Sequence, residues 1–265
     1  MTITWNAQFF DPGMARFLGE TASAAYQSEA ELKKKVKTWK MELGKFFFPD
    51  PEDRQDTQAF IAQNESAVII VFRGTESLKD WMTDADVQLV NGPAGKVHDG
   101  FQCGLNAVWR DLWKFLDEKR GQRTLWIAGH SLGGALATLA TAKLRLEKGT
   151  PVNGLYTFGS PRVGNEEFAR AFEQDFGERT FRFVNNNDIV PRVPFRLMNY
   201  RHVGKFIYFD QKGKINHKIS WEQLLLTRVQ GRIQELLKPG TDGIKDHSMV
   251  KYVTNLIKAL PARPR

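Results

Sequence analysis

Five consecutive residues near the middle of the chain, Gly129-His130-Ser131-Leu132-Gly133, have the types and spacing of a nucleophilic turn. Residues 124–128 before them form a short apolar run suited to a buried strand, and residues 134–140 after them are small, apolar and helix-forming. A chain that turns sharply from strand to helix strains the turning residue, and glycines two residues to either side avoid Cβ clashes. The pattern predicts an exposed serine hydroxyl beside helix-start amides that stabilise a developing anion.

A serine hydroxyl is a weak nucleophile, so it needs a histidine to take its proton and a carboxylate to orient that histidine. The five histidines are His98, His130, His202, His217 and His247. In hydrolases with this kind of turn the chain order is serine, then acid, then histidine, which excludes His98 and His130. His202 falls within a predicted strand over residues 200–210, where we expect it to pack.

Two histidines remain as candidate bases. His247 follows the flexible residues 238–243 and precedes a predicted helix over residues 249–256, which is where a loop histidine after the last strand belongs. His217 lies in a basic loop between Lys214 and Lys218. We favour His247 and keep His217 as the alternative.

Asp188 is the candidate orienting acid. It follows the predicted strand over residues 180–184, and active sites of α/β folds form at the carboxyl ends of such strands. Its three asparagine neighbours also fit a simple turn, but a serine and a histidine already in place favour the catalytic interpretation. The other aspartates considered fit the chain order poorly or lie too close to His247; they are Asp175, Asp210, Asp242 and Asp246.

A tetrahedral intermediate needs two aligned N–H donors. The residue after the nucleophile, Leu132, is expected to supply one of them, and a loop after an early strand the other. Residues 71–75 end such a strand, and Gly74 there lets the backbone turn closely. Thr75 could then offer its N–H and its hydroxyl.

The order of elements determines how these residues are positioned. Strands are expected over residues 56–62, 66–72, 154–158, 180–184 and 200–210, and helices over residues 101–120 and 166–176. Strands that alternate with helices indicate a mainly parallel sheet covered on both faces. We find no linker, so residues 1–265 are expected to form a single domain. We expect an amphipathic helix over residues 220–238 that packs on the core; the alternatives are a cap over the active site or a lipid-contacting surface.

Composition excludes several classes of protein. The net charge is +8, and much of it lies in residues 33–40, which we interpret as a solvated helix face; no nucleic-acid motif accompanies it. No apolar run is long enough to span a bilayer, and residues 1–6 lack the pattern of a Sec signal. The single cysteine, Cys103, excludes an intrachain disulfide, and we expect it in the core. A cytoplasmic protein, or one exported by a non-Sec route, is expected.

Beyond the serine turn, several motifs occur together in the chain. The four main ones are Phe72-Arg73-Gly74-Thr75, Gly129-His130-Ser131-Leu132-Gly133-Gly134, Tyr156-Thr157-Phe158-Gly159-Ser160-Pro161-Arg162-Val163-Gly164-Asn165 and Asn187-Asp188-Ile189-Val190-Pro191-Arg192. With these motifs the chain resembles the class 3 lipase family. The matched span covers roughly residues 56–188, with His247 beyond it.

The resemblance implies an α/β-hydrolase fold with a mainly parallel central sheet flanked by helices. It implies hydrolysis of acylglycerol esters without a cofactor or metal, and a triacylglycerol lipase is the expected function. By position, Ser131 would be the nucleophile, Asp188 the orienting acid and His247 the base. Thr75 and Leu132 would form the oxyanion hole, while His98 and His130 would be architectural.

Similar lipases carry a lid after the oxyanion residue, here residues 76–90. The expected partners are a lipid or small ester substrate and a peripheral lipid interface, with no nucleic acid and no transmembrane segment; we expect a monomer. The lack of disulfides and of a leader departs from fungal members of the family. A phospholipase A1 or a feruloyl-type esterase on the same fold, and a non-catalytic lipid-binding or signalling module, remain alternatives.

Overall fold

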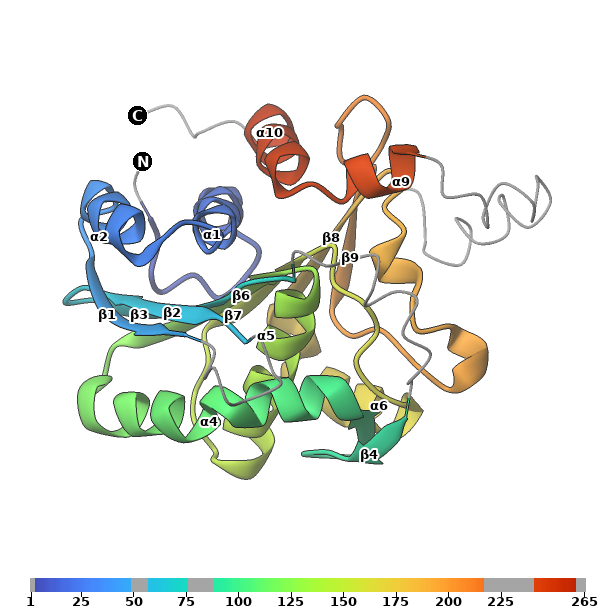
Figure 1. Cartoon of the computed structure of the whole chain (residues 1–265), viewed down its shortest axis with the longest axis horizontal. Helices are drawn as coiled ribbons and strands as arrows, with labels where there is room; N and C mark the ends of the chain where they lie inside the picture. The colour runs from blue at the N-terminus through green and yellow to red at the C-terminus, as the bar shows by residue number, and fades with distance from the viewer. Residues whose placement is uncertain (1–2, 49–56, 76–87, 217–240, 261–265) are drawn as a thin grey trace.

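The computed structural model describes residues 3–48, 57–75, 88–216 and 241–260, and a seven-stranded sheet forms the centre of this part of the chain (Figure 1). In spatial order its strands are β1 (Glu42–Phe47), β2 (Ala59–Gln63), β3 (Ala67–Phe72), β6 (Thr124–His130), β7 (Gly154–Phe158), β8 (Thr180–Asn185) and β9 (Lys205–Phe209). The strands from β3 to β9 are parallel, and β1 and β2 add an antiparallel edge. β4 (Leu89–Asn91) and β5 (Lys96–His98) pair separately, antiparallel. The predicted mainly parallel sheet is confirmed.

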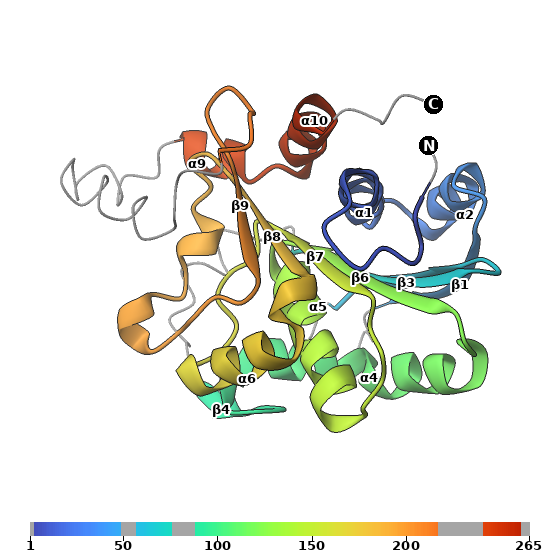
Figure 2. The same ribbon diagram turned by 180° about the vertical axis from the view of Figure 1, so that it is seen from behind.

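Helices cover both faces of this sheet (Figures 1 and 2). One face carries α1 (Pro12–Ala24), α2 (Glu29–Thr38) and α10 (Met249–Ala259), and the other carries α4 (Asp99–Lys119), α5 (Leu132–Ala142) and α6 (Glu166–Phe176). The shorter helical elements are α9 (Thr241–Asp246), η1 (Lys143–Glu147), η2 (Gly177–Arg179), η3 (Val190–Arg192) and η4 (Arg196–Met198). Successive residues of a central strand therefore meet different cores: Ile70 packs toward α4–α6, and Ile69 packs toward α1, α2 and α10.

Side-chain caps fix where several helices begin. The Asp11 carboxylate accepts the N–H of Met14 at 2.7 Å, and a proline occupies the start of α1, where its missing N–H costs nothing. Ser28 and Glu31 form a capping box at α2, and Asn165 caps α6. These caps satisfy amide groups that the first helical turn leaves unpaired.

Two local expectations were wrong. The strand expected over residues 200–210 begins only at Lys205, because Gly204 before it adopts a left-handed φ of 81° and His202 bonds to another loop. Cys103 is exposed rather than in the core. On α4 the inward face carries Phe101, Leu105 and Val108, and a residue two positions from Phe101 points away from it.

Two predicted segments fall largely where the structure gives no description. Residues 76–87 of the predicted lid and residues 220–238 of the predicted cap helix lie outside the described residues, as does His217. The last lid positions, Leu89 and Val90, belong to β4, where they pair with β5. Val90 packs against the α4–α6 core, so it does not extend an exposed lid face.

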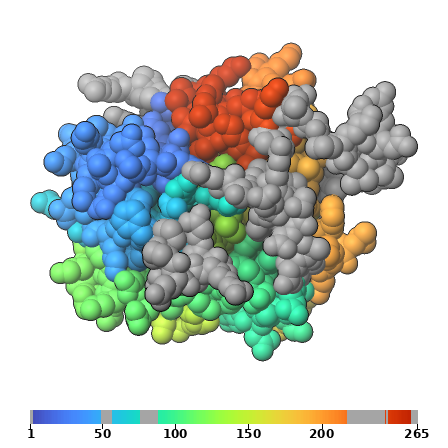
Figure 3. Space-filling view, in the orientation of Figure 1, coloured from blue at the N-terminus to red at the C-terminus, as the bar shows by residue number. Residues whose placement is uncertain are grey.

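Parallel strands bring their carboxyl ends to one edge of the sheet. The turns that follow β6 and β8 therefore meet there, although they lie far apart in the sequence. The chain returns to this edge at the junction of α9 and α10, where His247 lies. Figure 3 shows α10, in red, beside the blue α1–α2 region. Ser131, Asp188 and His247 thus come from three separate segments.

Candidate active site

Ser131 occupies the turn between β6, the middle strand of the sheet, and α5. Its backbone has φ 58° and ψ −131°, a conformation that a residue with a Cβ rarely adopts. The Ser131 N–H donates to the Phe158 carbonyl at 2.9 Å, which ties the turn to the next strand. The surrounding fold therefore imposes strain at this serine, a feature that clusters at functional sites.

Glycines make the turn possible. A Cβ on Gly129 would lie 2.1 Å from the Gly133 carbonyl oxygen, and one on Gly133 would lie 2.2 Å from the Phe72 carbonyl oxygen. Both contacts are backbone contacts that cannot relax, so strand and helix can approach this closely only without side chains. The elbow expected from the sequence is present in the backbone.

His247 and Asp188 form a buried pair. His247 Nδ1 lies 2.9 Å from Asp188 Oδ2 and 3.0 Å from Oδ1. A carboxylate at Nδ1 favours the tautomer that carries its hydrogen there, which leaves Nε2 as the proton acceptor. The structure therefore joins the two residues in the orientation that a base and its orienting acid require.

Two further groups hold the Asp188 carboxylate. Tyr252 on α10 donates its hydroxyl to Oδ2 at 2.6 Å, and the Val190 N–H donates to Oδ1 at 2.9 Å. Burial, followed by the nearby Asp188 charge, raises the pKa of Tyr252 well above its usual value, so the hydroxyl stays a donor. Nothing in the spacing of the sequence pointed to Tyr252.

His130 anchors the backbone of His247. Its Nε2 bonds to the His247 carbonyl oxygen at 2.7 Å and its Nδ1 bonds to the Tyr26 hydroxyl at 2.7 Å. Burial, followed by the neighbouring His247, lowers the pKa of His130 well below its usual value. A neutral ring donates through Nε2 and accepts through Nδ1, which satisfies both contacts. His130 thus links the segment after α1, the serine turn and the His247 loop.

Ser131 and His247 flank the same short stretch of chain. The Ser131 N–H bonds to Phe158, and a Cβ on the next residue, Gly159, would lie 2.9 Å from the His247 ring and 2.7 Å from Asp188 Oδ2. The His247 ring also stacks on His130, whose ring centroid is 4.5 Å away. Gly159 has a φ of 60°, so both space and backbone conformation demand glycine there.

The serine hydroxyl that the sequence predicted to be exposed is buried, so that prediction is wrong for this structure. Ser131 Oγ and His247 Nε2 are both buried, and neither has a hydrogen-bond partner among the described residues. A buried polar atom without a partner is costly and is expected at reactive sites. The two atoms do not bond to each other in this structure; catalytic contacts commonly tighten only when substrate is bound.

The segment that carries Thr75 passes directly against the serine. A Cβ on Gly74 would lie 2.9 Å from Ser131 Cβ and 2.8 Å from the His130 carbonyl oxygen. The Arg73 N–H bonds to the Gln58 carbonyl oxygen at 2.9 Å, which holds this segment to the strand before it. Leu132 is the first residue of α5, so its N–H lies at the helix start. Leu132 thus follows Ser131 directly, and Gly74, the residue before Thr75, lies against Ser131.

Two further histidines of the described residues, His98 and His202, occupy structural positions. His98 is buried and stacks on Phe101 with ring centroids 4.2 Å apart. His202 Nε2 bonds to the Pro191 carbonyl oxygen at 2.7 Å, outside the strand in which it was expected. Burial, followed by the charges of Arg182 and Arg162, lowers the pKa of His202.

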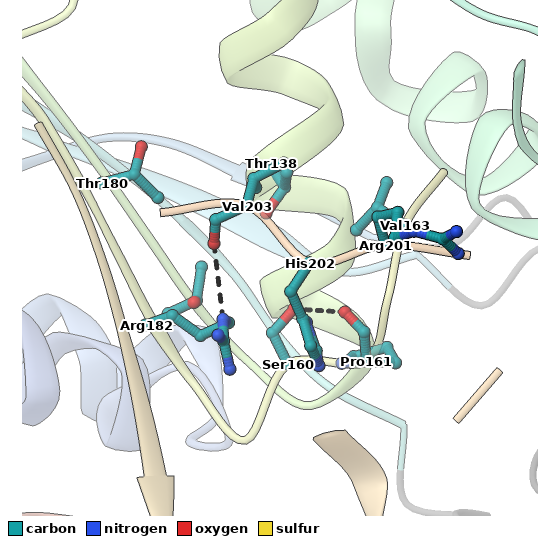
Figure 4. Close-up of a pocket in the computed structure, with 10 residues that line it drawn as sticks. Thr138, Ser160, Pro161, Val163, Thr180, Arg182, Arg201, His202 and Val203 are labelled. Carbon is teal, nitrogen blue, oxygen red and sulfur yellow. Dashed lines mark hydrogen bonds between the residues drawn. The ribbon is translucent and has the colours of Figure 1, made fainter. Parts of the chain in front are cut away.

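A small cavity is lined by residues of α5, β7 and β8, by the segment after β7 and by residues 201–203 (Figure 4). Hydroxyl side chains and Arg182 line it, and burial lowers the pKa of Arg182 to about 9, which leaves it charged at neutral pH. The cavity has a volume of about 10 Å³, which is room for one water molecule. It is far too small to hold an acyl chain.

Within residues 3–48, 57–75, 88–216 and 241–260, no cluster of three or more His, Cys, Asp or Glu side chains could hold a metal ion. In the same part of the chain, no helix combines the length and apolar character needed to cross a bilayer.

A mainly parallel sheet flanked by helices, with a serine turn after its middle strand and an Asp–His pair at the same edge, defines the α/β-hydrolase class. Comparison with known proteins agrees. Residues 69–198 match the model of the family described as lipase (class 3). A solved structure described as showing an unusual buried polar cluster in a family of fungal lipases is 30% identical, with a TM-score of 0.64, and covers 74% of this chain and 79% of its own. The chain belongs to the class 3 lipase family.

Two relatives of known description are similar over part of their length. The secreted mono- and diacylglycerol lipase A of Penicillium cyclopium is 39% identical over 158 residues, which is 56% of this chain and 50% of the relative. The triacylglycerol lipase OBL1 of Arabidopsis thaliana is 31% identical over 229 residues, which is 65% of this chain and 44% of the relative. The chain thus spans half or less of the length of these two relatives.

Proposed function

We propose that this protein hydrolyses carboxylic esters of acylglycerols through an acyl-enzyme on Ser131, with triacylglycerol as the expected substrate. The observation that carries the proposal is the Asp188–His247 pair beside a strained serine turn, with Ser131 Oγ and His247 Nε2 both buried and without a hydrogen-bond partner among the described residues. Two relatives described as lipases support an acylglycerol substrate.

Acylation begins when Ser131 Oγ attacks the ester carbonyl carbon while His247 Nε2 takes the hydroxyl proton. Asp188 stabilises the imidazolium that forms, through the bonds at Nδ1. The carbonyl oxygen becomes an oxyanion, which the N–H groups of Thr75 and Leu132 stabilise. The C–O bond then breaks, and the alcohol leaves with the proton from His247.

Deacylation repeats these steps with water. His247 takes a proton from a water molecule, whose oxygen attacks the acyl carbon. The second tetrahedral intermediate collapses, Ser131 recovers its proton from His247, and a fatty acid is released. The net reaction is ester plus water to alcohol plus acid, with no electron transfer.

The serine is tested by Ser131→Ala, which we expect to lower kcat on p-nitrophenyl esters by at least about 10⁴-fold. Ser66→Ala, in the exposed turn between β2 and β3, is the matched control and should keep wild-type rates. A fluorophosphonate probe should label the wild type and not Ser131→Ala. Wild-type hydrolysis by Ser131→Ala would disprove the proposed nucleophile.

The substrate is tested with a panel of mono-, di- and triacylglycerols, phospholipids and feruloyl esters. The Penicillium relative is described as a mono- and diacylglycerol lipase, so the rate ratio between diacylglycerol and triacylglycerol is the most informative value. A marked preference for phospholipid or feruloyl ester would replace the acylglycerol proposal with one of those activities.

Several broader expectations accompany the proposal. We propose a monomer whose residues 1–265 form one domain, and a peripheral contact with a lipid interface near the site. The Penicillium relative is described as secreted, whereas the sequence predicts a cytoplasmic protein or export by a non-Sec route. Sedimentation of the purified chain tests whether it is a monomer. Immunoblots of cells and culture medium test the compartment.

A further inference from the structure

The segment that follows Asp188 exposes large apolar side chains to solvent. Leu197 is fully exposed, Phe195 is 57% exposed and Met198 is 42% exposed, all within four consecutive residues. Single exposed apolar residues are ordinary, but a contiguous exposed group marks an interaction surface. We refer to residues 195–198 as the apolar turn.

The base of the apolar turn is held from beneath. The buried Arg162 guanidinium donates to the carbonyl oxygens of Arg192 and Pro194, the latter at 2.7 Å. His202 Nε2 bonds to the Pro191 carbonyl oxygen, also at 2.7 Å. These contacts fix the backbone before the apolar turn, so its side chains cannot simply fold back onto the core.

Part of the backbone of the apolar turn is hydrogen-bonded within the protein. The Met198 N–H donates to the Phe195 carbonyl oxygen at 2.9 Å, and the Asn199 N–H donates to the Arg196 carbonyl oxygen at 3.1 Å. Arg201 also donates to the Arg196 carbonyl oxygen at 3.1 Å. Unpaired backbone groups raise the cost of placing a loop in a lipid phase, so these hydrogen bonds lower the cost of placing the turn at a membrane surface.

The charged side chains around the apolar turn favour an anionic partner. Arg192 and Arg196 lie in the same segment, and Arg201 bonds to it. The Glu166 carboxylate pairs with Arg201 at 3.1 Å and with Arg170 at 3.6 Å. Apolar side chains beside arginines match a membrane surface that presents anionic headgroups above an acyl phase.

The apolar turn also lies on the side of the molecule that carries the candidate site. Asp188 precedes it by a few residues at the carboxyl end of β8. In Figures 1 and 2 the segment after β8, gold to orange, projects from the body away from α2. A lipid surface bound there would lie close to the edge of the sheet at which Ser131 stands.

We propose that residues 195–198 are a docking element that inserts into the surface of an anionic phospholipid membrane, with Arg192, Arg196 and Arg201 in contact with the headgroups. The proposal rests on the proposed function in one respect, because the docked membrane would be the source of the ester. It predicts stronger binding to anionic than to neutral vesicles, weakened by salt.

The test uses the full chain carrying Ser131→Ala, so that hydrolysis does not alter the vesicles. Sedimentation should give at least about tenfold tighter binding to phosphatidylcholine–phosphatidylglycerol vesicles than to phosphatidylcholine vesicles, since each cation near an anionic surface contributes several-fold. Adding Phe195→Ser and Leu197→Ser should weaken the anionic binding by at least about tenfold. Phe9→Ser, at a phenylalanine elsewhere that is 79% exposed, is the control.

A second measurement protects the test against misfolded variants. Cys103 is the single cysteine and is exposed, so a chain carrying Cys103→Ser and Leu197→Cys accepts a polarity-sensitive dye at position 197 alone. The dye emission should shift to the blue with anionic vesicles. No shift, equal binding to neutral vesicles, or undiminished binding by the serine variants would overturn the docking proposal.

The two proposals fail separately. If the wild type hydrolyses no ester while Ser131→Ala binds anionic vesicles as expected, the proposed function is wrong and the docking element stands. If the wild type hydrolyses soluble esters but neither vesicle is bound, the docking proposal alone is wrong.

Discussion

At the scale of single residues, Tyr252 is the contact most open to a direct test. Tyr252→Phe removes the hydroxyl that donates to Asp188 and leaves the ring in place. A hydrogen bond to a charged group contributes about 1.5–3 kcal/mol, so we expect kcat on a soluble ester to fall by about tenfold or more with little change in KM. Steady-state kinetics with p-nitrophenyl butyrate measure this.

The control for that variant is Tyr156→Phe, at another buried tyrosine of the same core. Its hydroxyl does not contact Asp188, so its kcat should stay close to that of the wild type. Equal losses in both variants would mean that Tyr252 acts through packing and not through the carboxylate.

Gly159 offers a sharper steric test at the same scale. In Gly159→Ala the new methyl group would meet Asp188 Oδ2 at 2.7 Å and the His247 ring at 2.9 Å. The acid–base pair must then move, and a displacement of about 1 Å costs roughly 10²-fold in rate. The rate of fluorophosphonate labelling of Ser131 should fall by at least that factor.

A second glycine with the same backbone conformation separates the effect of the steric contact from the effect of the left-handed backbone. Gly149 has the same φ of 60° as Gly159, but a Cβ there meets nothing within 4 Å. Gly149→Ala should therefore lose only about 1 kcal/mol of stability for the left-handed backbone and keep its labelling rate. If both variants label at the wild-type rate, the argument from Gly159 contacts is wrong.

At the scale of elements, the turn between β6 and α5 is expected to store strain. Ser131 has a positive φ of 58°, which glycine adopts freely and alanine does not. Both Ser131→Gly and Ser131→Ala abolish the nucleophile, yet we expect the glycine variant to be about 1 kcal/mol more stable. For a chain of this size that is roughly 2–4 °C in Tm by calorimetry.

The ranking of the two variants decides that prediction. A glycine variant no more stable than the alanine variant would mean that the turn is relaxed, because the extra chain entropy of unfolded glycine would then dominate. Catalytic loss alone cannot distinguish these cases, so the comparison uses stability.

At the scale of the whole molecule, two buried histidines should make the fold sensitive to acid. Burial lowers the pKa of His130 and of His202 below 6.5, so both stay neutral in the native state when unfolded histidines take up protons. Their contribution to the free energy of unfolding is complete above pH 6.5, and it is lost as the pH falls toward the native pKa. Each of these histidines is therefore expected to lower the free energy of unfolding by about 1.4 kcal/mol as the pH falls from 7.5 to 5.5.

Urea unfolding at those two pH values measures this loss. In His202→Gln the amide can still donate to the Pro191 carbonyl oxygen, but it does not titrate. Between these two pH values the free energy of unfolding of the variant should therefore fall by about 1.4 kcal/mol less than that of the wild type. An identical pH dependence would show that His202 titrates normally in the native state.

The sequence alone determined the features that depend on neighbouring residues. The strand, glycine-flanked serine and helix of residues 124–142 are contiguous, so their pattern predicted the turn. Alternating strands and helices likewise predicted the parallel sheet. Chain order excluded His98 and His130 as the base, and the loop position of His247 favoured it; its partner Asp188 lies 59 residues before it in the sequence.

Only the tertiary structure decided what surrounds those residues. Tyr252, Tyr26 and Gly159 reach the site because α10, the segment after α1 and the end of β7 pack against one edge of the sheet. Local propensity and periodicity carry no information about such contacts, since they depend on how layers of the fold meet. Exposure of the apolar turn, residues 195–198, was likewise decided by the tertiary structure, because the sequence does not show whether an apolar side chain is buried or exposed.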